Sequence, residues 1–173
     1  MKKVILVLVL ISLVTVGTLF AEHPNGLGIG VVGGGNYGLI GSSFGGHAGL
    51  SLKVPSLPIF WGIIAGFVPY YFSVSVTGDS YLFDSEIIPT LGWFLGVGGY
   101  FSFYSYTGNN GYVRLAVGGR VPVGLSWQPL DLIELFIDVA PSFGLSIGAA
   151  SNNAAMGFDF MVPVEIGFRL WFN

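Results

Sequence analysis

Apolar and polar positions alternate over the C-terminal stretch 158–172. Every second residue, beginning with Phe158, is apolar, whereas the other register contains Asp159, Glu165 and Arg169. A period of two indicates a β-strand with one apolar and one polar face. The stretch exceeds a typical globular strand of about 5–6 residues and suits a tilted membrane-crossing strand of about 9–11 residues with an overhang. We therefore predict that it is the closing strand of a transmembrane β-barrel.

Seven further segments show the same alternation, and turn residues separate them. The eight predicted strands cover residues 26–34, 44–54, 59–68, 72–83, 91–104, 112–127, 134–147 and 158–172. An even strand number is typical of small bacterial barrels. The prediction is an all-β fold, an eight-stranded antiparallel transmembrane β-barrel with up-and-down meander topology. A helix bundle is the alternative, because 57–76 and 87–106 are uncharged, but frequent Gly and Pro and abundant Val, Phe and Tyr favour strands.

The N-terminus has the features of a secretory signal peptide. Two lysines follow Met1, an uncharged run extends to Phe20, and the small residue Ala21 precedes a glutamate. An uncleaved helical anchor is the alternative, since the run is nearly long enough to span a membrane. We predict cleavage near Ala21, with residues 1–21 as the signal peptide and 22–173 as the barrel of an outer-membrane protein.

Charge and composition exclude several classes of function. Beyond the predicted leader there are four basic and nine acidic residues, a net charge of −5, and no basic patch, so we expect no nucleic-acid partner. Cysteine is absent, and no cluster of His, Asp and Glu has metal-ligand spacing, so we expect neither a metal nor another cofactor. The glycines of 28–33 match G-x-G-x-x-G but lead into a loop instead of a helix, and we attribute them to space in the lumen.

Charged residues on the predicted strands all fall on the register that faces the lumen. A random distribution would direct about half of them to lipid, where each costs about 2–4 kcal/mol near the midplane. The predicted lumen charge network comprises Lys53, Asp79, Arg114, Arg120, Glu134, Asp138, Asp159, Glu165 and Arg169. Eight strands leave room for little more than side chains, which favours a salt-bridged plug over an open polar lumen. We expect Arg114 and Arg120 to pair with Glu134 and Asp138, joined by Glu165 and Arg169.

Aromatic residues form two predicted interfacial girdles at the ends of the strands. If the closing strand ends in the periplasm, the tryptophans lie at that end and the tyrosines at the other. The girdle residues are Trp61, Trp93, Trp127, Trp171, Tyr70, Tyr71, Tyr104, Tyr106 and Tyr112.

Three prolines, Pro122, Pro141 and Pro163, lie inside consecutive predicted strands. Each removes a hydrogen bond of the ladder, and a closed barrel has no free edge to hide it. We therefore expect bulges or local kinks at these positions.

His47 is the one histidine inside a predicted strand, and Ser43 or Ser51 could be considered as its nucleophile. A catalytic serine needs a base within hydrogen-bond reach that a third group orients. The sequence indicates no such third group, and the parity of His47 directs it into the lumen. We predict a hydrogen-bonded interior histidine and no enzymatic activity.

The leader, the eight alternating segments and the end Gly167-Phe-Arg-Leu-Trp-Phe172 resemble the small eight-stranded outer-membrane barrels of the OmpX, OmpW and opacity-protein type. The segments 118–127 and 134–144 are similar to strands of short spirochaete outer-membrane barrels. The resemblance implies outer-membrane lipid as the surroundings and insertion by the barrel-insertion machinery through the C-terminal strand. Such families usually end on the aromatic residue, whereas here Asn173 follows it.

The predicted function is that of a small integral outer-membrane protein with a structural or surface-interaction role and a side-chain-filled, salt-bridged lumen. An extracellular ligand is not identified by the sequence. The alternative is a porin-like, narrow channel for ions, small solutes or apolar compounds.

Overall fold

The structure, a computed structural model, describes residues 23–38, 43–68, 71–106, 112–150 and 153–172. The predicted signal peptide, 1–21, lies outside the described residues. The strands are β1 (Leu27–Gly38), β2 (Ser43–Lys53), β3 (Phe60–Val68), β4 (Tyr71–Ile88), β5 (Leu91–Tyr106), β6 (Tyr112–Arg120), β7 (Val123–Leu130), β8 (Ile133–Val139), β9 (Ser142–Ala150) and β10 (Asn153–Phe172). Within the described ranges, no helix is long and apolar enough to cross a membrane.

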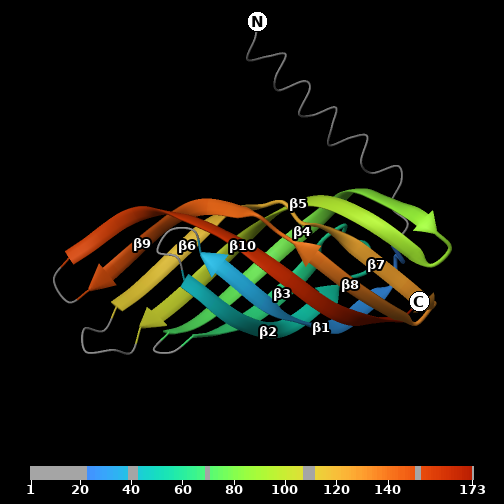
Figure 1. The fold of residues 1–173 in the computed structure, drawn as a ribbon, viewed down its shortest axis with the longest axis horizontal. Coiled ribbons are helices and arrows are strands. Elements are labelled where there is room, and N and C mark those ends of the chain that lie inside the picture. Colours follow the sequence, from blue (N-terminus) through green and yellow to red (C-terminus); the bar gives the residue numbers. More distant parts are fainter. Residues whose placement is uncertain (1–22, 39–42, 69–70, 107–111, 151–152, 173) are drawn as a thin grey trace, which may run out of the picture.

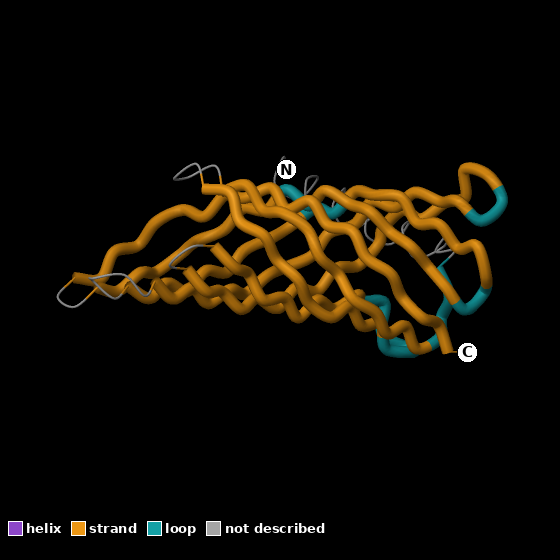
Figure 2. Tube along the Cα trace, turned by 60° about the horizontal axis from the view of Figure 1, so that its bottom comes forward, coloured by secondary structure: helices purple, strands orange, loops and turns teal. Residues whose placement is uncertain are grey.

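The sheet closes on itself because its first and last strands pair. β1 and β10 are antiparallel partners from Leu27 opposite Phe172 to Gly38 opposite Met161. All other pairings are antiparallel as well, and they link the strands into one continuous sheet. Figure 1 shows the strands tilted around the long axis, with β1 beside β10, and Figure 2 shows the same wall from another side. The predicted all-β antiparallel barrel is therefore confirmed.

The eight predicted strands correspond to ten, because two of them are interrupted at prolines. β6 gives way to β7 at Val121–Pro122, and β8 gives way to β9 at Ala140–Pro141. The pairing with neighbouring strands keeps one register on both sides of each break, so the inward and outward faces are not exchanged. The predicted irregularity occurs at Pro122 and Pro141, whereas β10 runs through Pro163 without a break.

The three prolines lie near one another on neighbouring strands. At each of them only one of the two backbone hydrogen bonds of an antiparallel residue pair is formed. The bonds present are Gly96 N to Pro122 O (2.8 Å), Val121 N to Pro141 O (3.0 Å) and Ala140 N to Pro163 O (3.0 Å). The reciprocal bonds cannot form, since proline has no backbone N–H. One of the affected carbonyls, that of Ala140, instead accepts a hydrogen bond from Ser142 Oγ at 2.7 Å.

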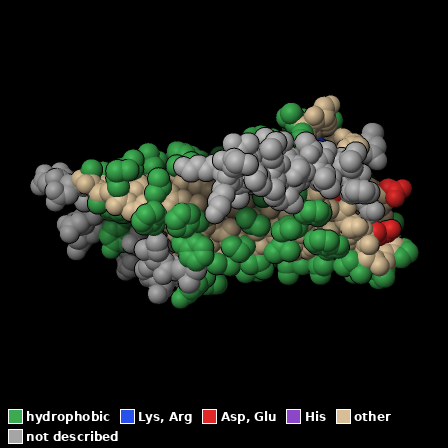
Figure 3. All heavy atoms as spheres, turned by 90° about the horizontal axis from the view of Figure 1, so that it is seen from above, with side chains coloured by type: hydrophobic (Ala, Val, Ile, Leu, Met, Phe, Trp, Pro, Cys, Tyr) green, Lys and Arg blue, Asp and Glu red, His purple; other side chains and the backbone are tan. Residues whose placement is uncertain are grey.

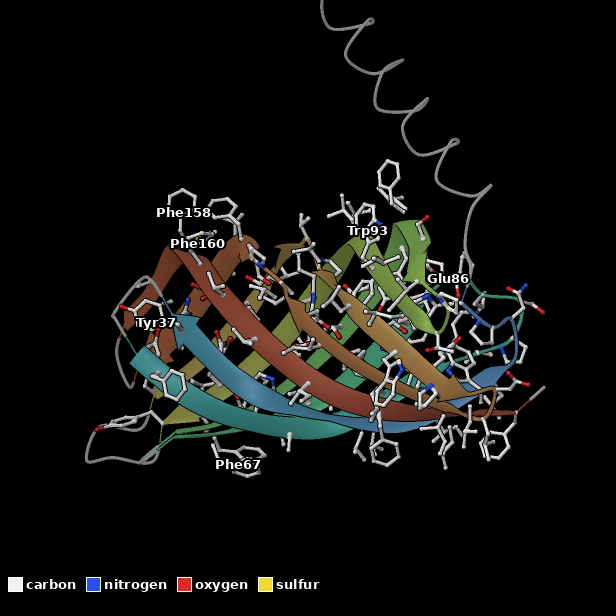
Figure 4. All side chains as sticks on the ribbon, turned by 45° about the vertical axis from the view of Figure 1, so that its right-hand side comes forward. Tyr37, Phe67, Glu86, Trp93, Phe158 and Phe160 are labelled. Atoms are coloured by element: carbon white, nitrogen blue, oxygen red, sulfur yellow. The ribbon has the colours of Figure 1, made fainter. Side chains whose placement is uncertain are left out.

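Apolar side chains cover the outside of the barrel, and polar side chains point inward. On β10, Ile166 is 62% exposed, whereas its neighbour Glu165 is only 6% exposed. Phe67 and Trp93 project away from the ribbon in Figure 4, and Figure 3 shows hydrophobic side chains spread over the visible wall, with acidic ones at one end. A wall of this kind suits a lipid environment.

The β4–β5 hairpin differs from the prediction. The sequence indicated a turn from Asp84 to Thr90, but β4 continues to Ile88, and Thr90, with φ of 75°, completes a tight turn. Register shifts at Tyr81/Phe83 and again near the tip disrupt the period of two, which hid the strand from sequence reading. As a result Asp84 is buried inside the barrel.

We name the two ends by the chain. The terminal end is where β1 begins and β10 ends, at the right in Figure 1, and the loop end is the opposite one.

Candidate functional site in the lumen

The structure places all nine residues of the predicted charge network on the inward register. Eight of them are buried, namely Lys53, Asp79, Arg120, Glu134, Asp138, Asp159, Glu165 and Arg169. The ninth, Arg114, has a side chain that is 25% exposed. The ion pairs form at three levels along the barrel axis.

At the terminal end, Glu134 is the centre of a buried group that we call the terminal cluster, made of His23, Asp84, Glu134, Arg169 and Trp171. Glu134 is fully buried and accepts hydrogen bonds from Arg169 Nη1 at 3.0 Å and Trp171 Nε1 at 2.9 Å. It also accepts one from Ser126 Oγ at 3.0 Å. The imidazole of His23 bridges two carboxylates, with Nε2 at 2.9 Å from Glu134 Oε1 and Nδ1 against Asp84 Oδ2.

Aromatic rings fill the space around the terminal cluster. Tyr81 stacks between Phe60 and Phe94, with ring centroids 4.1 and 4.3 Å away. The guanidinium of Arg169 lies 4.0 Å from the centroid of Phe136 and 4.7 Å from that of Phe60. Such cation–π contacts strengthen in the absence of water. The lumen around Glu134 and Arg169 is thus packed with side chains.

His23 lies outside the strands, just before β1, and contributes a positive charge to the terminal cluster. Burial disfavours the charged ring, but hydrogen bonds and charge attraction from Asp84 and Glu134 outweigh it and raise the pKa of His23 to about 9. The ring is therefore cationic at neutral pH. His23 and Arg169 then balance the two carboxylates.

A second group, the central cluster of Asp79, Arg120, Asp138 and Glu165, lies further along the lumen. Arg120 donates two hydrogen bonds to Glu165, at 2.9 and 3.3 Å, and its Nε lies 3.2 Å from Asp79 Oδ1. Asp138 is 5% exposed, and its Oδ1 has no hydrogen-bond partner among the described residues. The bidentate pair is the strong contact of this level.

Beyond the central cluster the lumen widens toward the loop end. Arg114 Nη2 lies 2.6 Å from Asp159 Oδ1, and Tyr100 donates its hydroxyl to Asp159 Oδ2 at 2.9 Å. Around this pair is a cavity of about 330 Å³, which we call the loop-end cavity. Among the described residues, no group of three or more His, Cys, Asp and Glu side chains could hold a metal ion.

The predicted partners within the charge network were wrong for both arginines of β6. Arg114 and Arg120 pair with residues of β10 and β4, and neither forms an ion pair with Glu134 or Asp138 in the described structure. The reason is the antiparallel register, which places Arg120 opposite Ser142. Glu134 consequently lies nearer the terminal end than either arginine.

One tryptophan was wrongly assigned to the interfacial girdle. Trp93 and Trp127 are 37% and 47% exposed on the outside near the terminal end, and Trp61 shares the outward register of β3. Trp171, in contrast, is 2% exposed, because its N–H donates to Glu134 inside the lumen. It belongs to the inward register of β10, together with Arg169.

The tyrosine girdle also differs from the prediction. Tyr104 and Tyr112 line the loop-end cavity, and Tyr106 lies on the same inward register of β5 as Tyr104. Tyr70 and the side chain of Tyr71 lie outside the described residues. The alternation of β5 and β6 explains the difference, since these tyrosines share parity with Ser102 and Arg114.

Ser51, one of the two serines considered with His47, is hydrogen-bonded to an arginine instead. Ser51 Oγ accepts a hydrogen bond from Arg169 Nε at 2.8 Å, and Ser43 is the first residue of β2, whose side chain lies outside the description. His47 is interior as predicted, with Nε2 3.9 Å from Glu165 Oε1, but this nitrogen has no hydrogen-bond partner among the described residues. The interior position of His47 agrees with the prediction, whereas its Nε2 makes no hydrogen bond within the described residues.

Wall and lumen together define a class of fold, the small closed antiparallel β-barrel of outer-membrane proteins. The structure is similar to the crystal structure of Neisserial surface protein A (NspA), with a TM-score of 0.51 and 13% sequence identity. The alignment covers 84% of this chain and 96% of NspA. It is also similar to a major outer membrane protein from Thermus thermophilus, with a TM-score of 0.50 and 11% sequence identity. That alignment covers 85% of this chain and 98% of the Thermus protein. Identities this low show a common fold.

By sequence, the chain belongs to the family described as "Protein of unknown function (DUF3996)", which it matches over residues 40–170. No curated protein matches the sequence.

Proposed function

We propose that the protein is an integral outer-membrane β-barrel with a closed lumen, which serves a structural or surface-interaction role without conduction or catalysis. The observation that supports this proposal is how the cavities are distributed along the barrel axis. A void of about 20 Å³, lined by Asp138, Glu165 and Arg169, lies between the loop-end cavity and a pocket of about 200 Å³ at the terminal end. Little more than one water fits in such a void.

The clusters resist opening because the buried charges of Glu134 and Arg169, and of Arg120 and Glu165, are paired. Removing one member of a buried pair leaves the other unpaired, at a cost of about 3–5 kcal/mol. Glu134 has four donors around it, so a path past it would disrupt Arg169, Trp171 and His23 together. The filled lumen therefore supports the closed state over a narrow channel.

The terminal end is assigned to the periplasm in this proposal. Trp93 and Trp127 are exposed on the outer wall near that end, as expected of an interfacial aromatic belt. The loop end, with its cavity, then faces the outside of the cell. An interaction with a partner outside the cell would take place there.

Osmotic swelling of proteoliposomes tests the proposal. Vesicles that contain the refolded protein should swell in small neutral sugars no faster than empty vesicles. Folding is verified by the different mobility of boiled and unboiled protein on a gel. Rapid swelling with folded protein would support the channel alternative instead.

A further inference from the structure

The loop-end cavity has the size of a small-molecule site. Its volume of about 330 Å³ lies at the lower end of the range of about 300–1,000 Å³ that ligand pockets occupy. Residues of seven strands, β1 to β6 and β10, line it, and the central cluster closes its floor through Arg120 and Glu165. The space is large enough for one six-membered ring with substituents.

Charges in the cavity wall are already paired. Arg114 is matched by Asp159, and Arg120 by Glu165, so two cations face two anions. A charged ligand would have to enter without a free counter-charge, so the cost of removing it from water would not be offset. The wall therefore favours a neutral ligand.

Hydroxyl groups form a row along one side of the cavity. Ser73, Ser75 and Thr77 occupy successive inward positions of β4, and Ser102 faces them from β5. Ser75 Oγ and Ser102 Oγ lie 2.7 Å apart. Each hydroxyl can donate one hydrogen bond and accept two, so this side has capacity for further partners. An apolar ligand would cover these groups without satisfying them.

Three buried polar atoms of residues that line the cavity have no hydrogen-bond partner among the described residues, namely Arg120 Nε, His47 Nε2 and Asn36 Oδ1. Arg120 Nε lies 3.2 Å from Asp79 Oδ1 in an ion pair, which leaves His47 Nε2 and Asn36 Oδ1. The side chain of His47 is 7% exposed, so bulk solvent does not readily reach it. Buried polar groups in native proteins are nearly always paired, with protein or with ordered water, and a ligand that displaces such water has to replace its hydrogen bonds. These two atoms point to an occupant with both donors and acceptors.

We propose that the loop-end cavity binds a small neutral polyhydroxylated molecule of the size of one sugar ring. Ser75, Ser102, Asn36 and His47 would exchange hydrogen bonds with its hydroxyls. The tyrosine rings of Tyr104 and Tyr112, which also line the cavity, offer apolar surfaces for its C–H faces. The inference goes beyond the closed-barrel function and does not depend on whether the lumen conducts.

The test is ligand-detected NMR and calorimetry on the full-length protein in detergent. The probes are glucose, galactose and mannose, with glucuronate as a charged ring and cyclohexanol as a less polar one. At least one neutral sugar should bind saturably, and more tightly than glucuronate or cyclohexanol. If none of the three sugars binds to folded protein, or if glucuronate or cyclohexanol binds best, the proposal is overturned.

Matched substitutions locate the site. Ser75→Phe fills the cavity, whereas Val76→Phe, one residue further along β4, adds the same ring to the lipid face, where Val76 is 40% exposed. We expect Ser75→Phe to weaken sugar binding at least about tenfold and Val76→Phe to leave it unchanged. If Ser75→Phe does not fold, Asn36→Leu with the outward control Tyr37→Leu replaces it. Equal binding by the inward variant and its control would overturn the assignment.

Discussion

The two halves of the lumen share the long strands β4, β5 and β10 but are filled in different ways. In the terminal half the inward positions carry large rings, such as Phe60, Tyr81 and Phe94, around a fully buried carboxylate. In the loop half the inward positions of β4 and β5 carry Ser73, Ser75 and Ser102, and a cavity results. The comparison teaches that alternation decides which residues face inward, whereas side-chain volume decides whether the lumen is closed.

The largest expected effect is the loss of Glu134 from the terminal cluster. Glu134→Ala removes the acceptor of Arg169, Trp171 and His23 and should lower the free energy of unfolding by about 3–5 kcal/mol. The control is Leu135→Ala on the outer face, where lipid or detergent refills the space and we expect the smaller loss. Chemical denaturation in detergent measures both. Equal losses would show that the cluster does not hold the terminal half together.

A second substitution probes the boundary between the halves. Arg120→Ala leaves Glu165 and Asp79 without their cation and should destabilise the barrel by about 3 kcal/mol. The matched change Val117→Ala, on the same strand at a position that is 59% exposed, should cost less. A greater loss for Val117→Ala in the same denaturation experiment would contradict the role of the central cluster.

The pH dependence of stability isolates His23. The pKa of His23 in the folded protein, about 9, is above the ordinary value of 6.5. Its contribution to the free energy of unfolding is therefore complete below pH 6.5. The contribution then declines as the pH rises and is lost above pH 9. We expect wild-type protein to lose on the order of 1–3 kcal/mol over this interval.

His23→Ala serves as the control, since the variant lacks the titrating group and should show a flatter profile across that pH interval. Unfolding free energies at a series of pH values provide the comparison. Identical slopes for wild type and variant would mean that His23 is not held between its two carboxylates.

The smallest effect is expected in the loop half. Arg114 forms its ion pair with Asp159 beside the cavity, and its side chain is 25% exposed. Water can therefore solvate Asp159 when the arginine is removed, and Arg114→Ala should cost only about 1 kcal/mol. Denaturation alongside Arg120→Ala measures the difference. A loss as large as that of Arg120→Ala would indicate that the two halves are equally closed.

Much of the fold could be predicted from the sequence because a period of two is a local property. The alternation of residues 158–172 identified the outward face of β10, including Ile166, and the inward face that carries Glu165 and Arg169. The same parity places Trp171 inside, but a tryptophan at a chain end was read as an interfacial residue. Its buried hydrogen bond to Glu134 depends on a strand that is distant in sequence.

The pairing of the charges could not be read from parity alone. Parity gives the face of a residue, whereas its level along the barrel depends on the register between strands. For Arg120 the sequence does contain this information. Counting residues along both strands from the turn at 131–132 places Arg120 opposite Ser142 and away from Glu134. For Asp84 no such count works, because the bulges of β4 shift the register. The inward position of His23 has no sequence signal, as it precedes the first strand.

The central claim, that the terminal and central clusters together close the lumen, is tested most directly by single-channel conductance in planar bilayers. Folded wild-type protein should give almost no conductance, because the terminal and central clusters separate the two cavities. Arg120→Ala should raise the conductance, and Val117→Ala should not. Steady, large conductance from wild-type protein would contradict the claim and show that the buried charges line an open path.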